Sequence, residues 1–271
     1  MSRLLALAVL LAASPAAADL RFALRNDVFT DLSPPIDDAG FTQDFDIRFW
    51  RPYRGYAIGG MLFDRWVTSR VNDDRRDLLE LAATVERPWL HPTQPALVTV
   101  GARLGPVFTG NLGGRWMQNG WHTISKTGPT LDEGLQHNYV GELDAGAFAG
   151  VHARGEVGTW LQGYGSLDGQ VSVGTGVSWI EAAIGARGNA RVGRALLSAH
   201  VELAESRFAV TDDLLALPGG YGEGMQFSWR AGVAVAWQRL RFEYQYRTNE
   251  GGSGEPIGVI AFTIKQAGTT F

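Results

Sequence analysis

A histidine in the longest predicted loop is the residue best placed for acid–base chemistry. His122 lies in the segment from Thr109 to Asn138, which opens with a Gly-rich piece. A short helix there would bring Gln118 onto the same face, one turn away. An imidazole titrates near neutral pH, so it can take a proton from water and return it later. Because functional residues concentrate on loops above a rigid scaffold, we take His122 and Gln118 as a candidate catalytic pair.

A second group of polar residues falls near the start of the chain. Asn26 and Asp27 end one alternating segment, and Thr42 opens the next. If these segments are neighbouring strands, the three side chains cluster at one rim, although Asn26 needs a local distortion at the strand end. A carboxylate, an amide and a hydroxyl could there hold a hard divalent cation through oxygen ligands. A polar turn that satisfies its own backbone is the other interpretation.

The other histidines have simpler surroundings. His91 stands in a Pro-flanked turn, which indicates a solvated side chain, and His200 alternates onto the polar face of its segment. His137 and His152 fall at predicted element ends without an obvious partner. None of them predicts a catalytic site.

Polar and apolar residues alternate with a period of two over much of the chain, which indicates that β-strands position the candidate catalytic and metal-binding residues. Charges on one face, and aromatic residues at both ends of the other, are typical of a barrel strand that faces lipid. A soluble periplasmic β-sandwich also alternates, but it would not fill one face with charges in this way. The pattern therefore predicts an all-β fold, a closed antiparallel transmembrane β-barrel of about twelve strands. The clearest apolar face is Phe227, Trp229, Ala231, Val233, Val235 and Trp237, and the next segment sets Leu240, Phe242, Tyr244 and Tyr246 against Arg239, Arg241, Glu243, Gln245 and Arg247.

The first 18 residues have the build of an export signal. Arg3 precedes the apolar stretch Leu4 to Ala13, and small residues up to Ala18 form a cleavage site. That stretch is too short to cross a bilayer as a helix, and charges interrupt every other apolar run. We therefore expect a signal peptide at 1–18 and one barrel domain at 19–271 in the bacterial outer membrane.

Composition excludes several classes of protein. The chain has no cysteine, so it forms neither a disulfide nor a thiolate metal site. Its 24 Lys and Arg against 28 Asp and Glu give a net charge of -4, which argues against nucleic acid as a partner. Nine Trp residues suit aromatic girdles at the membrane interfaces. We expect a monomer.

The alternation and the turn residues locate the strands. An even number places both ends of the barrel domain on the periplasmic side, and the connections that then lie outside are mostly the longer ones, apart from a tight turn near Gly163. Gly176–Arg191 could be a further strand pair or a periplasmic insertion. The predicted strands are Leu20–Val28, Phe41–Arg51, Gly55–Trp66, Asp77–Arg87, Ala96–Phe108, Tyr139–Gly150, Ala153–Gln162, Gly163–Gly174, Arg194–Arg207, Gln226–Gln238, Arg239–Thr248 and Pro256–Ile264.

The order of the polar motifs resembles the outer-membrane lipid A 3′-O-deacylases, the LpxR family. The resemblance implies a twelve-stranded barrel that needs Ca²⁺ and removes an ester-linked acyl chain from the lipid A of lipopolysaccharide. It extends loosely over the whole mature chain. The motifs that carry it are, in chain order, Asn26-Asp27, Phe41-Thr42, Gly105-Pro106 and Gln118-Asn119-x-x-His122.

The resemblance also implies a role for each candidate residue. In that family a histidine is the general base that activates water, and an aspartate helps to hold Ca²⁺. An asparagine and the metal together stabilise the oxyanion. These roles would fall on His122, Asp27 and Asn26, while Gln118 and Thr42 would line the same site. Ester hydrolysis needs such a base and such an electrophile.

The chain departs from the family pattern at two of these motifs. Gln43 and Asp44 stand where the family has Asn and Gly. Gly128 occupies the position of a carboxylate that orients the imidazole, and Asp132 and Glu133 are the nearest acids. The departures leave open a differently oriented base, a different substrate or a loss of activity.

Two other functions compete with this interpretation. One is a non-enzymatic outer-membrane barrel, either porin-like or an inactive relative. The other is a lipase that uses a serine nucleophile, but no His-x-Ser motif is present, and Ser125 is the nearest serine after His122.

Overall fold

The computed structural model describes residues 18–26, 40–69, 74–91, 93–110, 138–139, 143–210, 224–248 and 256–266. Within these ranges it contains no helix long and apolar enough to cross a membrane. The strands are β1 (Asp19–Asn26), β2 (Gly40–Tyr53), β3 (Tyr56–Ser69), β4 (Asp74–Leu90), β5 (Ala96–Gly110), β6 (Asn138–Tyr139), β7 (Asp144–Gly158), β8 (Leu161–Val173), β9 (Val177–Val192), β10 (Ala195–Val210), β11 (Gly224–Trp237), β12 (Leu240–Arg247) and β13 (Ile257–Ile264).

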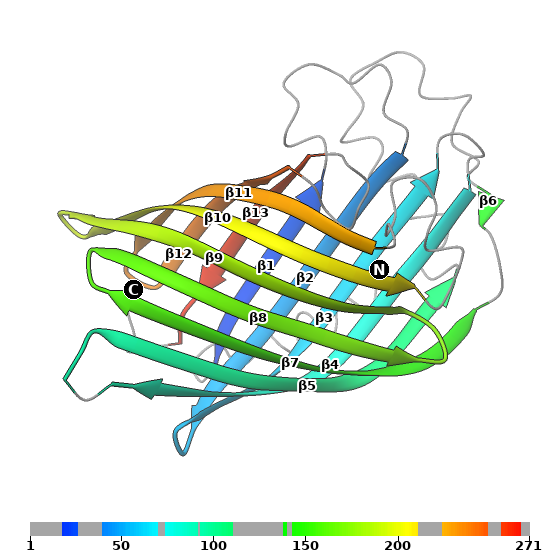
Figure 1. Ribbon diagram of the computed structural model, residues 1–271, viewed down its shortest axis with the longest axis horizontal. Helices are drawn as coiled ribbons and strands as arrows, with labels where there is room; N and C mark the ends of the chain where they lie inside the picture. The colour runs from blue at the N-terminus through cyan, green and yellow to red at the C-terminus, as the bar shows by residue number, and fades with distance from the viewer. Residues whose placement is uncertain are drawn as a thin grey trace, which may run out of the picture.

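Twelve of these strands form a closed antiparallel barrel, as the alternation predicts (Figure 1). Each pairs with its neighbour along the chain, β5 pairs with β7, and β1 pairs with β13 to close the wall. The two-residue β6 lies beside the start of β4 in parallel and takes no part in the closure. Closure leaves no unpaired edge among the described wall strands, which is the condition for strands to cross a bilayer.

The predicted strand boundaries are wrong in the middle of the chain. β7 runs unbroken through Gly150, where the sequence predicts the end of one strand and the start of another. Residues 177–192 form the single strand β9, where a strand pair or an insertion is predicted. The predicted turn near Gly163 falls inside β8. The errors offset each other, so the number of wall strands is still twelve.

The glycines explain these errors. A Cβ atom at Gly150 would lie 2.7 Å from Nε of Arg103, so this glycine makes room for a side chain inside the barrel and does not mark a turn. The true turns contain glycines with a positive φ, which are Gly158 at 111° and Gly174 at 91°. Sequence alone does not distinguish the two uses of glycine.

The two ends of the barrel differ in their connections. The turn end has the short links 54–55, 91–95, 159–160, 193–194 and 238–239. The loop end has 27–39, 70–73, 111–143, 174–176, 211–223 and 248–256. In Figure 1 most hairpins of the turn end lie at the left and bottom, and the loop ends of β2, β3 and β4 lie at the upper right. Long connections at one end and short ones at the other are the asymmetry that the sequence predicts.

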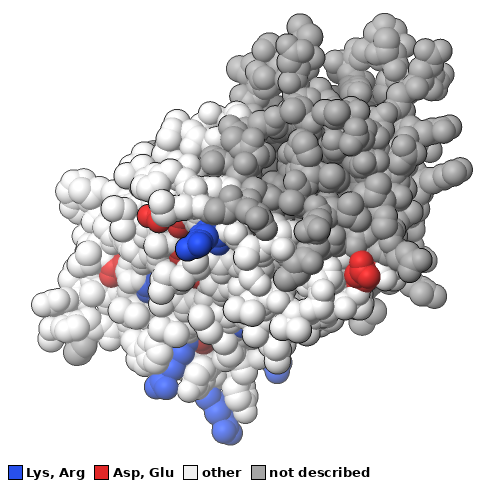
Figure 2. Space-filling view, turned by 45° about the vertical axis from the view of Figure 1, so that its right-hand side comes forward, with Lys and Arg blue, Asp and Glu red and all other residues white. Residues whose placement is uncertain are grey.

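The outer face of the wall is apolar. Val233 is 58% exposed and Phe242 is 48% exposed, as expected of side chains that meet lipid and not a second sheet. The space-filling view shows a wide surface with few charged side chains (Figure 2). Among the side chains that the structure describes, the outward-facing charges lie toward the strand ends and are Arg51, Asp64, Asp77, Arg87, Glu205 and Arg207.

Candidate functional site

The loop end of β1 and β2 is where the sequence predicts the metal and the catalytic residues. Asn26 pairs with the residue that follows Thr42, so the two positions lie on adjacent strands at nearly the same level. The expectation that the first two strands meet at one rim is therefore confirmed for the backbone. Asp27, Gln118 and His122 lie outside the described residues, and their convergence with Asn26 and Thr42 stays a prediction.

The segment with the candidate histidine leaves the barrel at the same level. One row of register partners crosses four strand pairs through Asn26, Gln43, Trp66, Asp77 and Gly110. Gly110 is the last residue of β5, and the connection 111–143 follows it. At about 4.8 Å between strands, the row spans roughly 19 Å, a distance that a connection of this length can cover. All the motif segments thus begin or end at one rim.

Two carboxylates stand on the outer face of this rim. Arg65 contacts Asp44 inside the lumen, so alternation turns Asp64 outward, and Asp77 is outward for the same reason. Asp64 is 7% exposed and Asp77 is fully buried. The two are diagonal neighbours, since Asp77 pairs with the residue two positions after Asp64. Two buried acids on the outer face of an otherwise mostly apolar wall mark an unusual part of the surface.

The acidic pair Asp64 and Asp77 can be recognised in the sequence, although the alternation by itself does not single it out. Asp64 interrupts the apolar outward series after Leu62, and Asp77 precedes the outward Leu79 and Leu81. An acid at an outward position of an otherwise apolar series is the detectable feature.

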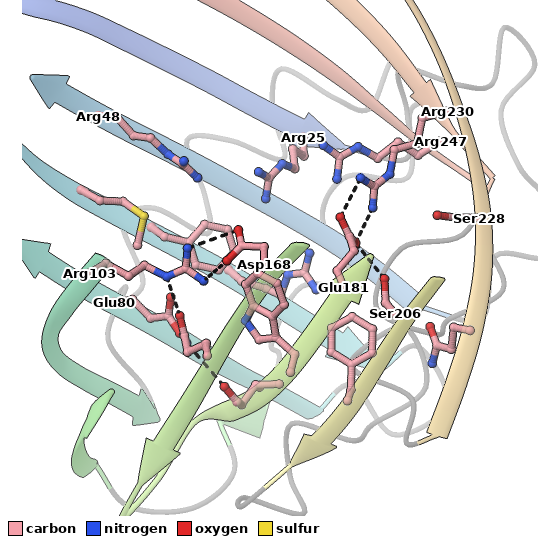
Figure 3. Close-up of a pocket in the computed structure, with 18 residues that line it drawn as sticks. Arg25, Arg48, Glu80, Arg103, Asp168, Glu181, Ser206, Ser228, Arg230 and Arg247 are labelled. Atoms are coloured by element: carbon pink, nitrogen blue, oxygen red, sulfur yellow. Dashed lines mark hydrogen bonds and ion pairs between the residues drawn. The ribbon is translucent and has the colours of Figure 1, made fainter. Parts of the chain in front are cut away.

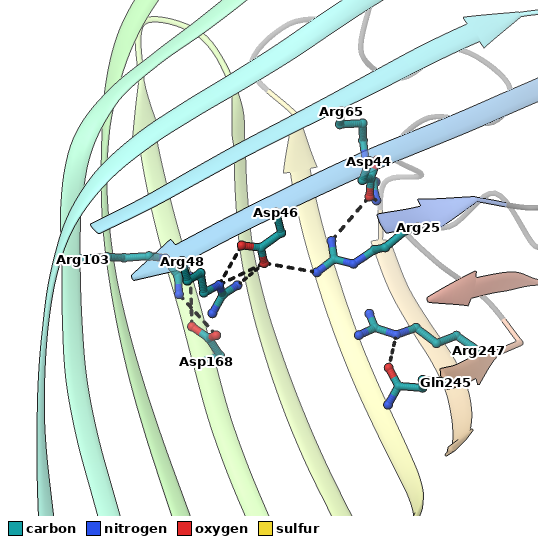
Figure 4. Close-up of polar contacts among 9 residues, drawn as sticks. All are labelled: Arg25, Asp44, Asp46, Arg48, Arg65, Arg103, Asp168, Gln245 and Arg247. Carbon is teal, nitrogen blue, oxygen red and sulfur yellow. Dashed lines mark hydrogen bonds and ion pairs between the residues drawn. The ribbon is translucent and has the colours of Figure 1, made fainter. Parts of the chain in front are cut away.

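Arginines and aspartates form a buried cluster inside the barrel below the rim (Figure 4). Asp44 accepts hydrogen bonds from Nε of Arg65 at 2.7 Å and from Nη2 at 2.5 Å, and it lies 3.5 Å from Nη1 of Arg25. Asp46 accepts from Nε of Arg48 at 2.9 and 3.0 Å. Both aspartates face the lumen, where they contact these arginines. The departure from the family at Asp44 therefore supplies a partner for two lumen arginines.

Contacts between strands that are not neighbours fill the lumen. The side-chain amide of Gln170 in β8 donates to Glu80 in β4 at 2.5 Å and accepts from Arg103 in β5 at 3.1 Å. Arg230 of β11 donates to Glu181 of β9 at 2.5 Å. These contacts span two or three strands of the wall, and the buried apolar cluster reaches further, from Met61 in β3 to Val177 in β9, so together they narrow the lumen among the described residues.

A cavity of about 250 Å³ remains in the lumen toward the loop end (Figure 3). Arginines from β1, β2, β11 and β12 line one arc of its wall. The facing arc runs from β3 to β10, where β3, β9 and β10 supply apolar side chains and β4, β5 and β8 supply the polar Glu80, Arg103, Asp168 and Gln170. The residues of the first arc are Arg25, Arg48, Arg230 and Arg247, and the apolar members of the second are Met61, Phe63, Val177, Trp179 and Phe208.

The described histidines lie away from the rim. His200 faces the lumen as predicted, and its Nε2 lies 2.9 Å from the side-chain nitrogen of Gln245. Nδ1 of His91 accepts a backbone hydrogen bond in its exposed turn, also as predicted. His152 is not at an element end but within β7, and its Nε2 lies 3.6 Å from Glu86. In the described part of the chain, no three His, Cys, Asp or Glu side chains are grouped to hold a metal ion.

Comparison with known proteins supports the architecture. No protein-family model matches the chain, and no curated protein matches it in sequence. Among solved structures, LpxR from Salmonella typhimurium is similar over 91% of this chain and 99% of its own, with a TM-score of 0.60 and 10% identity. The beta domain of the Bordetella autotransporter BrkA has a TM-score of 0.49 and 12% identity, over 92% of this chain and 98% of its own. The translocator domain of the autotransporter NalP from Neisseria meningitidis has 0.45 and 11%, over 97% and 93%. At these identities the likeness concerns the fold, which matches bacterial outer-membrane barrels.

Proposed function

We propose that the protein is an outer-membrane ester hydrolase that removes an acyl chain from lipid A and depends on Ca²⁺. The observation that carries the proposal is the common rim: Asn26, Thr42 and the start of the connection with His122 all lie at the loop end of the barrel. The shared barrel architecture is consistent with it. The order of the motifs along the chain resembles that of the lipid A 3′-O-deacylases, and this resemblance is the basis for the role proposed for each residue.

The proposed reaction is the attack of water on an ester carbonyl. His122 takes a proton from the water as its oxygen bonds to the carbonyl carbon, and the imidazolium returns that proton to the departing sugar oxygen. Asn26 donates a hydrogen bond to the oxyanion, and Gln118 and Thr42 position the ester. The products are a fatty acid and a lipid A with a free hydroxyl.

The donor atoms of the rim suit a hard cation. Asp27 offers a carboxylate, and the amide oxygen of Asn26 is also a ligand type that Ca²⁺ accepts. The buried carboxylates of Asp64 and Asp77 add negative charge on the outer face of the same rim. When bound, Ca²⁺ would polarise the ester carbonyl as a Lewis acid.

The lumen argues against the porin-like alternative. Ion pairs and amide contacts join β4 to β8, β5 to β8 and β9 to β11 through the interior. A diffusion pore requires an open polar lumen. A barrel without enzymatic activity remains the outcome that the experiment must exclude.

The test uses purified protein in vesicles that contain lipid A and Ca²⁺. We expect wild type to release fatty acid and excess chelator to stop the release. His122→Ala should lower the rate at least about 100-fold, since a general base contributes roughly 10²–10⁴-fold. His91→Ala is the matched control, because that imidazole is exposed in a turn at the opposite end of the barrel and should leave the rate unchanged. Release that persists in His122→Ala or in excess chelator would overturn the mechanism.

A further inference from the structure

The lumen cavity has an apolar arc that is unusual for the inside of a barrel. Met61, Leu78, Val107, Phe148 and Val177 pack into one buried cluster within the lumen, on strands β3, β4, β5, β7 and β9. A small barrel can fill its interior with side chains, but the lumen of a membrane barrel is usually polar. Here the cluster reaches the cavity surface, so an apolar ligand could replace water against it.

Aromatic rings extend this apolar arc and are held in place by arginines. The guanidinium of Arg103 lies 5.0 Å from the centre of the Trp179 ring, and that of Arg25 lies 5.5 Å from the centre of the Phe63 ring. Both rings line the cavity. Cation–π contacts of this kind fix ring orientation and place positive charge beside an apolar surface.

On the arginine arc, Arg25 and Arg48 have paired acids that are buried behind them, whereas Glu181, the partner of Arg230, itself lines the cavity. The Arg48 side chain is 44% exposed, whereas its partner Asp46 is 1% exposed. Arg25 is likewise more exposed than Asp44, at 14% against 0%. Figure 3 shows Arg25, Arg48 and Arg230 reaching toward the cavity from one side. The cavity lining contains six arginines against three acids, Glu80, Asp168 and Glu181, so the cavity surface has an excess of positive charge.

The position and size of the cavity define the ligand further. It lies toward the loop end, and below it the contacts of His200 with Gln245 and of His152 with Glu86 occupy the lumen. Its volume of about 250 Å³ is slightly below the usual range of small-molecule pockets, roughly 300–1,000 Å³. It therefore suits an anionic headgroup with a single chain.

We propose that this cavity binds a fatty acid, with the carboxylate on the arginine arc at Arg48 and the chain along Met61, Trp179 and Phe208. Arginine matches a carboxylate through paired hydrogen bonds, and the apolar arc removes the chain from water. The site goes beyond the proposed hydrolysis and does not depend on it, because a free fatty acid is the ligand whatever its source.

The test measures quenching of tryptophan fluorescence by a brominated fatty acid, with the protein in lipid nanodiscs. The chain has nine Trp residues, so the contribution of Trp179 is the part of the quenching that Trp179→Phe removes. We expect that part to saturate with the brominated acid and not with the brominated alcohol of equal length. Trp237→Phe, which removes an outward-facing ring, is the matched control and should leave the saturable part unchanged.

A charge variant tests the headgroup contact. Arg48→Gln should weaken binding about tenfold or more, because hydrogen bonds to charged groups are worth roughly 1.5–3 kcal/mol, and Arg48→Lys should retain most of it. Heat-modifiable mobility on gels confirms that each variant is folded. Quenching that does not saturate, that is equal for the alcohol, or that is unchanged in both Trp179→Phe and Arg48→Gln overturns the proposal. No ester is present, so the result is independent of whether the protein hydrolyses lipid A.

Discussion

The outer and inner faces of the barrel wall are built from the same strands. Near the loop end, each face contains residues of the kind that is typical of the other face. The outer face is mostly apolar, and two of its six described charges, Asp64 and Asp77, are buried near the loop end. The lumen face is charged except where Met61, Phe148 and Val177 pack inside it. In the turn half, by contrast, the outward charges Arg51 and Arg87 are exposed. Natural sequences tend to depart from the expected polar and apolar pattern at functional sites. The departures on both faces therefore indicate that the functional site lies in the loop half of the barrel.

The largest predicted effect is in the lumen. Asp44→Ala removes the carboxylate that pairs with Arg65, whose side chain is 3% exposed. Breaking a buried pair on one side costs about 3–5 kcal/mol. Urea unfolding in detergent should show this loss, and Asp44→Ala combined with Arg65→Met should recover most of it. A single variant as stable as wild type would show that the lumen pairs do not hold the barrel together.

A charge placed on the outer face tests whether that face of the wall meets lipid. Val233→Arg puts a cation in the middle of β11 facing lipid, which should cost about 2–4 kcal/mol. Met225→Arg, near the end of the same strand and also outward, should cost only about 0–1 kcal/mol. Unfolding in lipid vesicles measures both values. Equal costs at the two positions would contradict the membrane-spanning orientation.

The outward acids Asp64 and Asp77 should raise the affinity of the proposed metal site for Ca²⁺. Asp64→Asn and Asp77→Asn each remove one negative charge, and Asp64 lies two strands, or about 10 Å, from the strand that leads to Asp27. At that distance a carboxylate and a divalent cation interact by roughly 0.8–3.3 kcal/mol. The Ca²⁺ concentration for half-maximal hydrolysis should therefore rise about fourfold or more. Glu205→Gln, an outward acid on β10, is the control that should leave it unchanged.

The smallest effect is expected for a contact between a carboxylate and a histidine that water reaches. Glu86 and His152 lie 3.6 Å apart, with side chains 43% and 24% exposed. Glu86→Gln should change the free energy of unfolding by less than about 1 kcal/mol, because exposed pairs are screened. A loss as large as that of Asp44→Ala would remove the distinction between buried and exposed pairs.

Most of the fold was predictable because a strand in a barrel assigns each residue to one of two faces. Arg241 and Glu243 face inward and Val233 outward, as the period of two requires. The break predicted near Gly150 failed because a glycine that makes room for Arg103 resembles a glycine in a turn. The residues next to Gly150 in the sequence do not reveal that a side chain from another strand, Arg103, occupies the space beside it.

The candidate site was predictable only in part. Alternation and chain order bring Asn26 and Thr42 to one rim, and the register of β1 and β2 confirms this for the backbone. The buried pair Asp64 and Asp77 was missed because an acid near a strand end is usually interpreted as a solvated residue. The lumen cavity was also missed, since its lining comes from strands far apart in the sequence and depends on how the barrel closes.

The central claim is that this barrel removes an acyl chain from lipid A through His122. The most direct measurement is mass spectrometry of lipid A from bacteria that express wild type or His122→Ala at equal levels in the outer membrane. The account predicts a lipid A lighter by one acyl chain in cells with wild type, and unchanged lipid A in cells with His122→Ala. Lipid A of unaltered mass in cells that carry correctly folded wild type would contradict it.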